Sequence, residues 1–136
     1  MKHALPLAIA ATLLAAPAIA DETADKPSAG ELELAELLAG RVAGEPVRCL
    51  RAGQRDGLRV IDSTALVFRD GRTLYVNRPR NAQFLDEWDV PVFRQFTSSL
   101  CELDQVEMRD RTSLMGGPVL VLDEFVPYTK PAKEEA

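Results

Sequence analysis

The chain has 136 residues, a formal net charge of −5, 46% hydrophobic residues and 27% charged residues. This composition is that of a globular protein, so we expect a single domain with a real hydrophobic core. The acidic balance excludes a general nucleic-acid binder, which needs a basic surface to contact phosphate groups.

The N-terminal residues carry the pattern of a cleavable secretory signal. A short basic start at Lys2 and His3 precedes an uncharged run rich in Ala and Leu. Ala18 and Ala20 are small residues on either side of one variable position before Asp21, so we predict cleavage after Ala20. The uncharged run is short for a membrane span, which disfavours a membrane anchor. We therefore expect a periplasmic protein with no transmembrane segment after signal removal.

The residues after the predicted cleavage site indicate a leader followed by a helix. Residues 21–28 are acidic and poor in apolar side chains, as in a flexible leader. Ser28 and Glu31 have the spacing of a capping box, in which each side chain accepts from a free backbone N–H near the helix start. Leucines at helical spacing then predict an amphipathic helix over residues 29–39, ended by Gly40.

Short runs of β-favouring residues follow the helix. Asp70 and Gly71 lie between two such runs and suit a type I′ hairpin turn. That turn would pair Val67 with Leu74, and both faces of the hairpin would be largely apolar, so we expect it at the centre of a sheet. The predicted strands in this part of the chain cover residues 47–52, 58–62, 65–68 and 73–76.

The second half of the chain gives weaker patterns. Phe84, Leu85 and Trp88 could share one face of a short helical turn, and Ser99 with Glu102 repeats the capping-box spacing of a single turn. Strands are predicted over residues 106–109 and 119–122, with an edge segment at 125–128 that tolerates Pro127 and a polar tail over 130–136.

These elements predict one α+β domain over residues 29–129. The N-terminal helix should pack on an antiparallel sheet of about five or six strands. The sequence leaves open whether the sheet stays open or is partly closed into a barrel.

The chain has two cysteines, Cys49 and Cys101. Outside the cytoplasm an even count favours a disulfide, and closing so long a loop would add about 4 kcal/mol to stability. Two separate buried thiols remain the alternative. A catalytic thiol is disfavoured because no histidine is available to activate it.

The only histidine, His3, lies in the predicted signal, and this restricts the chemistry of the exported chain. Its loss removes His-based catalysis and the usual zinc and copper sites, so we expect no catalytic residue, metal or cofactor. An acidic cluster at Asp86, Glu87 and Asp89 beside Trp88 has the residue types of a carbohydrate site. The alternative is a solvated acidic loop, which we favour.

Residues 41–80 carry nine bases, all arginines, against four acids. Arginine presents a rigid fork to carboxylate or phosphate, so an anion-binding face is one interpretation. Its best candidates are Arg78 and Arg80 beside Tyr75. The alternative, which we favour, is that the arginines pair with the acidic parts of the same chain or line exposed edges.

Short motifs are scattered between Pro46 and Pro127. They are Arg48-Cys49-Leu50, Arg59-Val60-Ile61-Asp62, Gly71-Arg72-Thr73-Leu74-Tyr75-Val76-Asn77-Arg78 and Ser99-Leu100-Cys101-Glu102-Leu103-Asp104. Together they resemble a family of small exported proteobacterial proteins, domain of unknown function 6491. The resemblance implies a fold family and no reaction, because the family has no established activity. Its members often carry two further cysteines, which residues 81–88 and 115–119 lack here, and this implies that the two remaining cysteines pair.

The leading functional hypothesis is a small non-enzymatic periplasmic module of the binding or envelope-associated kind, with an envelope component or an anionic ligand as its possible partner. It fits the signal, the disulfide, the missing histidine and the lack of a catalytic constellation. The alternative is a carboxylate-dependent hydrolase of cell-wall or other carbohydrate, built on Asp86, Glu87 and Asp89. A third hypothesis is a subunit that adds a partner strand at an exposed edge near residues 125–128.

Overall fold

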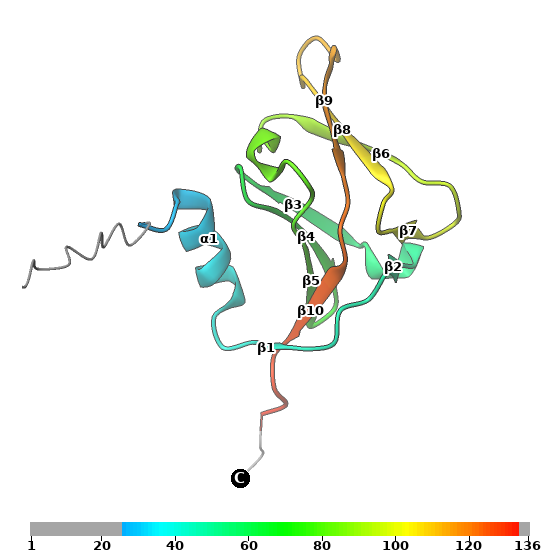
Figure 1. Ribbon diagram of the computed structural model, residues 1–136. Coiled ribbons are helices and arrows are strands. Elements are labelled where there is room, and N and C mark those ends of the chain that lie inside the picture. Colours follow the sequence, from blue (N-terminus) through cyan, green and yellow to red (C-terminus); the bar gives the residue numbers. More distant parts are fainter. Residues whose placement is uncertain (1–25, 134–136) are drawn as a thin grey trace, which may run out of the picture.

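The computed structural model describes residues 26–133 as one helix and a set of antiparallel β-sheets (Figure 1). The predicted α+β class is confirmed, and the sheets are not closed into a barrel. The predicted signal, its cleavage site at Ala18, Ala20 and Asp21, and most of the leader lie outside the described residues. The elements are α1 (Ala29–Leu38), β1 (Val42–Ala43), β2 (Cys49–Leu50), η1 (Ala52–Gln54), β3 (Gly57–Ile61), β4 (Ala65–Asp70), β5 (Thr73–Asn77), η2 (Ala82–Phe84), β6 (Val90–Arg94), β7 (Leu100–Cys101), β8 (Gln105–Arg109), β9 (Gly116–Val121) and β10 (Phe125–Thr129).

Helix α1 begins and ends where its sequence signals indicate. The Ser28 hydroxyl accepts a hydrogen bond from the Glu31 backbone N–H at 3.2 Å, which is one half of the predicted capping box. The other half is absent, because the Glu31 carboxylate binds Arg78 instead. At the C-terminal end Gly40 has φ +71°, the left-handed conformation that stops a helix without steric cost.

A five-stranded sheet in the order β1-β10-β5-β4-β3 forms the centre of the molecule. The hairpin β4–β5 lies inside this sheet, as predicted. Strand β10 was predicted as an edge, and this is wrong, because β1 pairs with it on the side away from β5. The Gly44 N–H donates to the Pro127 carbonyl at 2.7 Å on that outer side, which shows that the segment after β1 covers Pro127.

The predicted register of the β4–β5 hairpin is wrong by two residues. Val67 lies opposite Val76 instead of Leu74, and Asp70 pairs with Thr73, so the two loop residues are Gly71 and Arg72. Gly71 has φ +54°, and glycine at the first loop position is the requirement of a type II′ turn. A shift of two leaves every side chain on its predicted face, which is why both faces are still apolar.

A three-stranded sheet in the order β6-β8-β9 and a two-residue ladder between β2 and β7 complete the fold. Strand β6 was not predicted, and β7 was predicted as a helical turn at Ser99 and Glu102. That prediction is wrong, because Cys101 pairs with Cys49 and the Glu102 side chain pairs with Arg48. The predicted helical turn near Phe84 is reduced to the short η2 segment.

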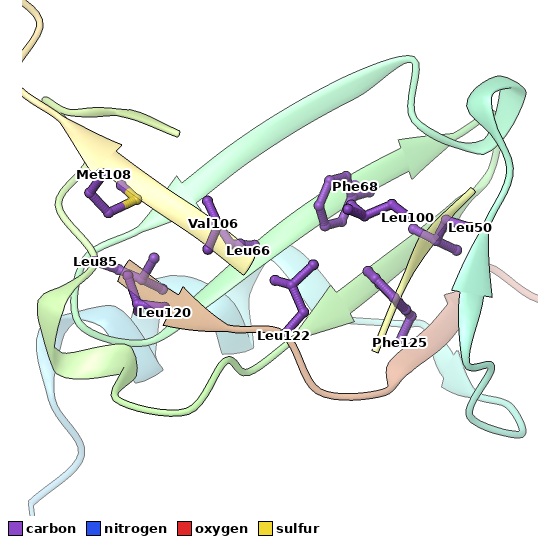
Figure 2. Packing of buried hydrophobic residues seen from close by; sticks show 10 residues of the cluster. All are labelled: Leu50, Leu66, Phe68, Leu85, Leu100, Val106, Met108, Leu120, Leu122 and Phe125. Atoms are coloured by element: carbon purple, nitrogen blue, oxygen red, sulfur yellow. The ribbon is translucent and has the colours of Figure 1, made fainter. Parts of the chain in front are cut away.

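Two apolar layers hold the structure together. On one face of the five-stranded sheet, Leu34 of α1 is buried with Val67 of β4 and Val76 of β5. The opposite face packs against the three-stranded sheet, and Figure 2 shows buried side chains from both sheets meeting there. We call these the helix face and the inner face of the five-stranded sheet. The buried residues of the inner core are Leu50, Leu66, Phe68, Leu85, Leu100, Val106, Met108, Leu120, Leu122 and Phe125.

Candidate functional site

The three residues predicted to bind an anion do not converge. Arg78 lies on the helix face, where its Nη1 and Nη2 atoms donate to the two Glu31 carboxylate oxygens at 2.5 and 3.0 Å. This hydrogen bond raises the pKa of Arg78 and lowers the pKa of Glu31. Tyr75 points to the inner face, where its hydroxyl accepts from Gln54 at 3.0 Å. Arg80 is exposed, and its backbone N–H donates to Val121.

Ion pairing within the chain accounts for only part of the arginine block. Arg48, Arg59 and Arg78 pair with Glu102, Glu33 and Glu31, respectively. The guanidinium groups of the other six arginines contact no carboxylate within residues 26–133. These six are Arg41, Arg51, Arg55, Arg69, Arg72 and Arg80.

The acidic cluster near Trp88 belongs to an exposed loop. Asp86 accepts from the Trp88 backbone N–H at 2.8 Å, so its carboxylate stabilises the turn of its own loop. The Glu87 backbone N–H donates to the Asp62 carboxylate at 2.6 Å, while the Trp88 side chain is 71% exposed. An exposed loop of this kind counts against the hydrolase hypothesis, which needs two carboxylates facing each other across a concave site.

The pKa of Asp89 is raised in this loop. Desolvation is the main cause, and the negative charges of Asp86 and Asp110 add to it, while Arg111 opposes them. Arg111 also donates from Nε to the Trp88 carbonyl at 2.9 Å, which joins this loop to the loop between β8 and β9. The acidic cluster therefore lies at a junction between two loops, and the hydrogen bonds of Asp86 and Arg111 are made to the backbone of Trp88.

A cleft opens between β3 and β6, the end strands of the two sheets. Its cavity volume is about 310 Å³, at the lower end of the range for small-molecule sites. We call it the β3–β6 cleft, and its lining residues are Ala52, Arg55, Leu58, Phe68 and Phe93.

The wall of the β3–β6 cleft is apolar and continuous with the inner core. Phe68 of β4 lies between Phe93 of β6 and Phe125 of β10, with ring centroids 5.8 and 5.7 Å apart. Leu58 of β3 is 38% exposed at the mouth of the cleft. An apolar group that entered here would continue the packing of the core, because the wall is already formed by core side chains.

Arg55 supplies the charge of the cleft. Its Nη1 donates to the Gln95 amide oxygen at 3.0 Å, which links the segment before β3 to the segment after β6. Its Nε is buried and has no hydrogen-bond partner within residues 26–133. Nε and Nη2 form the edge of the guanidinium group that can donate two parallel hydrogen bonds to a carboxylate or phosphate, and no described acceptor occupies this edge.

Two other arginines have a buried Nε without a described partner, but their settings differ. Arg41 uses Nη1 to bind the backbone carbonyls of Arg72 and Tyr128, and Arg109 uses Nη2 to bind Glu107. Neither lines the β3–β6 cleft, so among these three arginines only Arg55 belongs to the lining of that cleft.

A second cavity lies on the helix face of the same strand. It has a volume of about 150 Å³, with Leu37, Val67 and Leu74 as its apolar lining. Arg59 and Arg69 provide its charge, and Arg59 pairs with Glu33 of α1 at 2.5 Å. We call it the helix-face cavity, and Leu58 of β3 lines both this cavity and the β3–β6 cleft.

A third cavity, of about 210 Å³, includes Arg78 and lies over β5 and β10. Asp123 and Glu124 also line it, and Arg78 is already bound to Glu31. The two acids and the occupied guanidinium make this cavity less suited to an anion than the β3–β6 cleft.

The disulfide between Cys49 and Cys101 is confirmed. The two residues lie directly opposite each other in the β2–β7 ladder, and the next pair, Leu50 and Leu100, is fully buried in the inner core. The bridge therefore closes a loop of 52 residues and fixes one end of the inner core. Its position shows a structural role.

Within residues 26–133 no helix is long and apolar enough to cross a membrane, and no cluster of three potential metal ligands occurs. Comparison of the chain with protein-family models, curated proteins and solved structures found no match. The structural evidence on function therefore comes from this chain's own geometry.

Sequence reasoning did not single out Arg55, Leu58 or Phe93 as site residues. Arg55 was counted within the arginine block, but its position opposite Gln95 depends on two segments that are far apart in the chain. Phe93 lies in a strand that Pro91 concealed. The one sequence feature that could have indicated Arg55 is its place between two apolar runs, and many arginines in surface turns have the same setting.

Proposed function

We propose that this chain is a non-catalytic binding module that holds an anionic group with an apolar tail in the β3–β6 cleft. The observation that carries the proposal is the guanidinium group of Arg55, whose buried Nε has no described partner while its side chain lines an apolar cavity. A carboxylate or phosphate would accept two hydrogen bonds from the free Nε–Nη2 edge. The apolar tail would lie against Phe68 and Phe93.

The energetic argument rests on the cost of a buried donor without an acceptor. Such a donor costs about 1–3 kcal/mol, and a ligand oxygen that satisfies it recovers that energy on binding. The Gln95 side chain binds Nη1 and so orients the guanidinium group, and a small shift of the residues that cover Nε would open it to the ligand. Together these features favour a binding site for a small amphipathic anion.

The proposal includes export to the periplasm. The N-terminal signal pattern supports it, and a disulfide fits an oxidising compartment. Membership of the family called domain of unknown function 6491 is also part of the proposal and rests on the motifs around Cys49 and Cys101. That family has no established activity, so it neither supports nor opposes a ligand.

The carboxylate-dependent hydrolase is the weaker hypothesis. Asp86 and Glu87 are exposed, and the described hydrogen bond of Asp86 serves the backbone of its own loop. Among the described residues, none that lines the β3–β6 cleft carries a carboxylate for general acid–base chemistry.

Isothermal titration calorimetry with dodecanoate tests the proposal. We expect Arg55→Gln to weaken dodecanoate binding roughly tenfold to a hundredfold, the effect of losing hydrogen bonds to a charged group. The matched control is Arg80→Gln, which removes an exposed arginine outside the cleft and should leave the affinity unchanged. Equal loss in both variants, or no binding to the unaltered chain, would sink the proposal. Dodecyltrimethylammonium, which reverses the charge of the head group, should not bind.

A further inference from the structure

Strand β3 is the end strand of the five-stranded sheet, and its outer edge is free. Among residues 26–133, the backbone of Leu58, Arg59 and Val60 makes no hydrogen bond to any segment other than β4. An edge strand presents unpaired N–H and C=O groups that can template another strand.

The other sheet edges are shorter or carry protective residues. Strand β1, at the opposite end of the same sheet, has only two residues. Strand β6 contains Pro91 and β9 contains Pro118, and proline blunts an edge because it cannot donate a hydrogen bond. Strand β3 has five residues and no proline, so it is the edge best able to accept a partner strand.

Two cavities flank β3, one on each face of the sheet. The β3–β6 cleft lies on the inner face and the helix-face cavity on the other, and Leu58 lines both. Successive side chains of a strand point to opposite faces, and adjacent strands lie about 4.8 Å apart. A strand added beside β3 would therefore direct alternate side chains toward the two cavities.

The charges around the two cavities select the chemistry of the partner. Arg55 lies at the inner cleft, and Arg59 and Arg69 lie at the helix-face cavity. In the part of the chain that the structure describes, no acidic residue lines either cavity. Arg69 is exposed and contacts no carboxylate within residues 26–133, so it is available to an acidic side chain.

We propose that β3 binds an extended acidic segment of a partner protein, which adds to the five-stranded sheet as a further strand. The backbone of the segment pairs with the free edge of β3 and supplies the affinity. Its apolar side chains enter the β3–β6 cleft against Phe68 and Phe93, and its alternate acidic side chains reach Arg69 at the helix-face cavity. The inference rests on the proposed function, because the apolar side chains of the segment occupy the same β3–β6 cleft.

The test uses the full chain and a short labelled peptide that alternates glutamate with valine, with both ends blocked. Fluorescence anisotropy measures binding of this peptide and of two controls. One control carries N-methyl groups on alternate residues, which block its hydrogen bonds to β3. The other has lysine in place of glutamate. N-methyl groups on alternate residues block one edge of the peptide. When that edge is the one that faces β3, we expect the peptide to bind roughly tenfold more weakly than the unmethylated peptide. We expect the lysine peptide not to bind.

Arg69→Gln separates this inference from the proposed function. Arg69 lies outside the β3–β6 cleft, so the variant should weaken the acidic peptide roughly two- to fivefold and leave dodecanoate binding unchanged. If dodecanoate binds through Arg55 but the acidic and N-methyl peptides bind equally or not at all, the strand inference is overturned and the proposed function stands. If neither dodecanoate nor the peptide binds, both are overturned. Circular dichroism confirms that the variant is folded.

Discussion

Gly30 offers a sharp test of how α1 docks on the sheet, because two physical effects oppose each other there. Alanine is a better helix former than glycine by about 1 kcal/mol, so Gly30→Ala should stabilise an isolated helix. In this structure, however, a Cβ atom at Gly30 would lie 2.0 Å from the Thr64 Oγ1 and 2.4 Å from the Asp62 backbone oxygen. Both distances are shorter than real Cβ contacts allow.

The neighbours of Gly30 cannot move away cheaply. The Thr64 hydroxyl donates to the Asp62 carbonyl at 2.7 Å, so rotating it away loses a hydrogen bond worth about 1 kcal/mol. The Asp62 oxygen belongs to the backbone of the β3–β4 turn. Overpacking of this kind costs about 1–3 kcal/mol. The lost hydrogen bond and the gain in helix propensity, each about 1 kcal/mol, roughly cancel, so we expect Gly30→Ala to destabilise the protein by about 1–3 kcal/mol.

Urea unfolding followed by far-ultraviolet circular dichroism measures this change. The control is Gly53→Ala, where the new Cβ would meet nothing within 4 Å, and we expect it to be neutral or slightly stabilising. Thr64→Ala combined with Gly30→Ala should recover part of the loss, since the contact with Oγ1 is removed while those with the Asp62 oxygen at 2.4 Å and the Thr64 Cβ at 3.1 Å remain. An increase in stability for Gly30→Ala alone would refute the docking of α1 described above.

Two further predictions concern stability. Replacing Cys49 and Cys101 with serine should lower the free energy of unfolding by about 4 kcal/mol, because the bridge closes a loop of 52 residues; equal urea midpoints for the oxidised and reduced chains would contradict this. Hydrogen bonds from Arg94 and Arg109 lower the pKa of Glu107 below its ordinary value of 4.5. The charged carboxylate therefore stabilises the folded state, fully so above pH 4.5. This contribution is lost as the pH falls through the lowered pKa. Glu107→Gln should therefore be less stable than the unaltered chain at neutral pH and approach it in acid; a difference independent of pH would count against the ion pairs.

The parts of the fold that depend on local signals could be predicted from the sequence. The cap at Ser28, the stop at Gly40 and the apolar hairpin around Gly71 each depend on residues close in the chain. The hairpin register could not be predicted as securely, because Asp70-Gly71 and Gly71-Arg72 are both acceptable turns and only the packing of both faces decides between them.

Other parts depend on contacts between distant segments, and there local patterns misled. The capping-box spacing at Ser99 and Glu102 predicts a helical turn, yet Cys101 is held in a strand by its partner Cys49. Likewise, nothing local marks Arg55 as different from the other arginines. Its role in the candidate site arises only when η1 and the segment after β6 come together, which leaves its Nε buried beside the cleft.

The most direct test of the binding site is a nuclear magnetic resonance titration of the isotope-labelled chain with dodecanoate. We predict that the Arg55 side-chain Nε–H resonance shifts, together with the backbone amides of Leu58 and Phe93, because these groups line the cleft that takes the ligand. Shifts confined to the loop around Trp88, or an Arg55 Nε–H that does not respond at saturating ligand, would contradict the account.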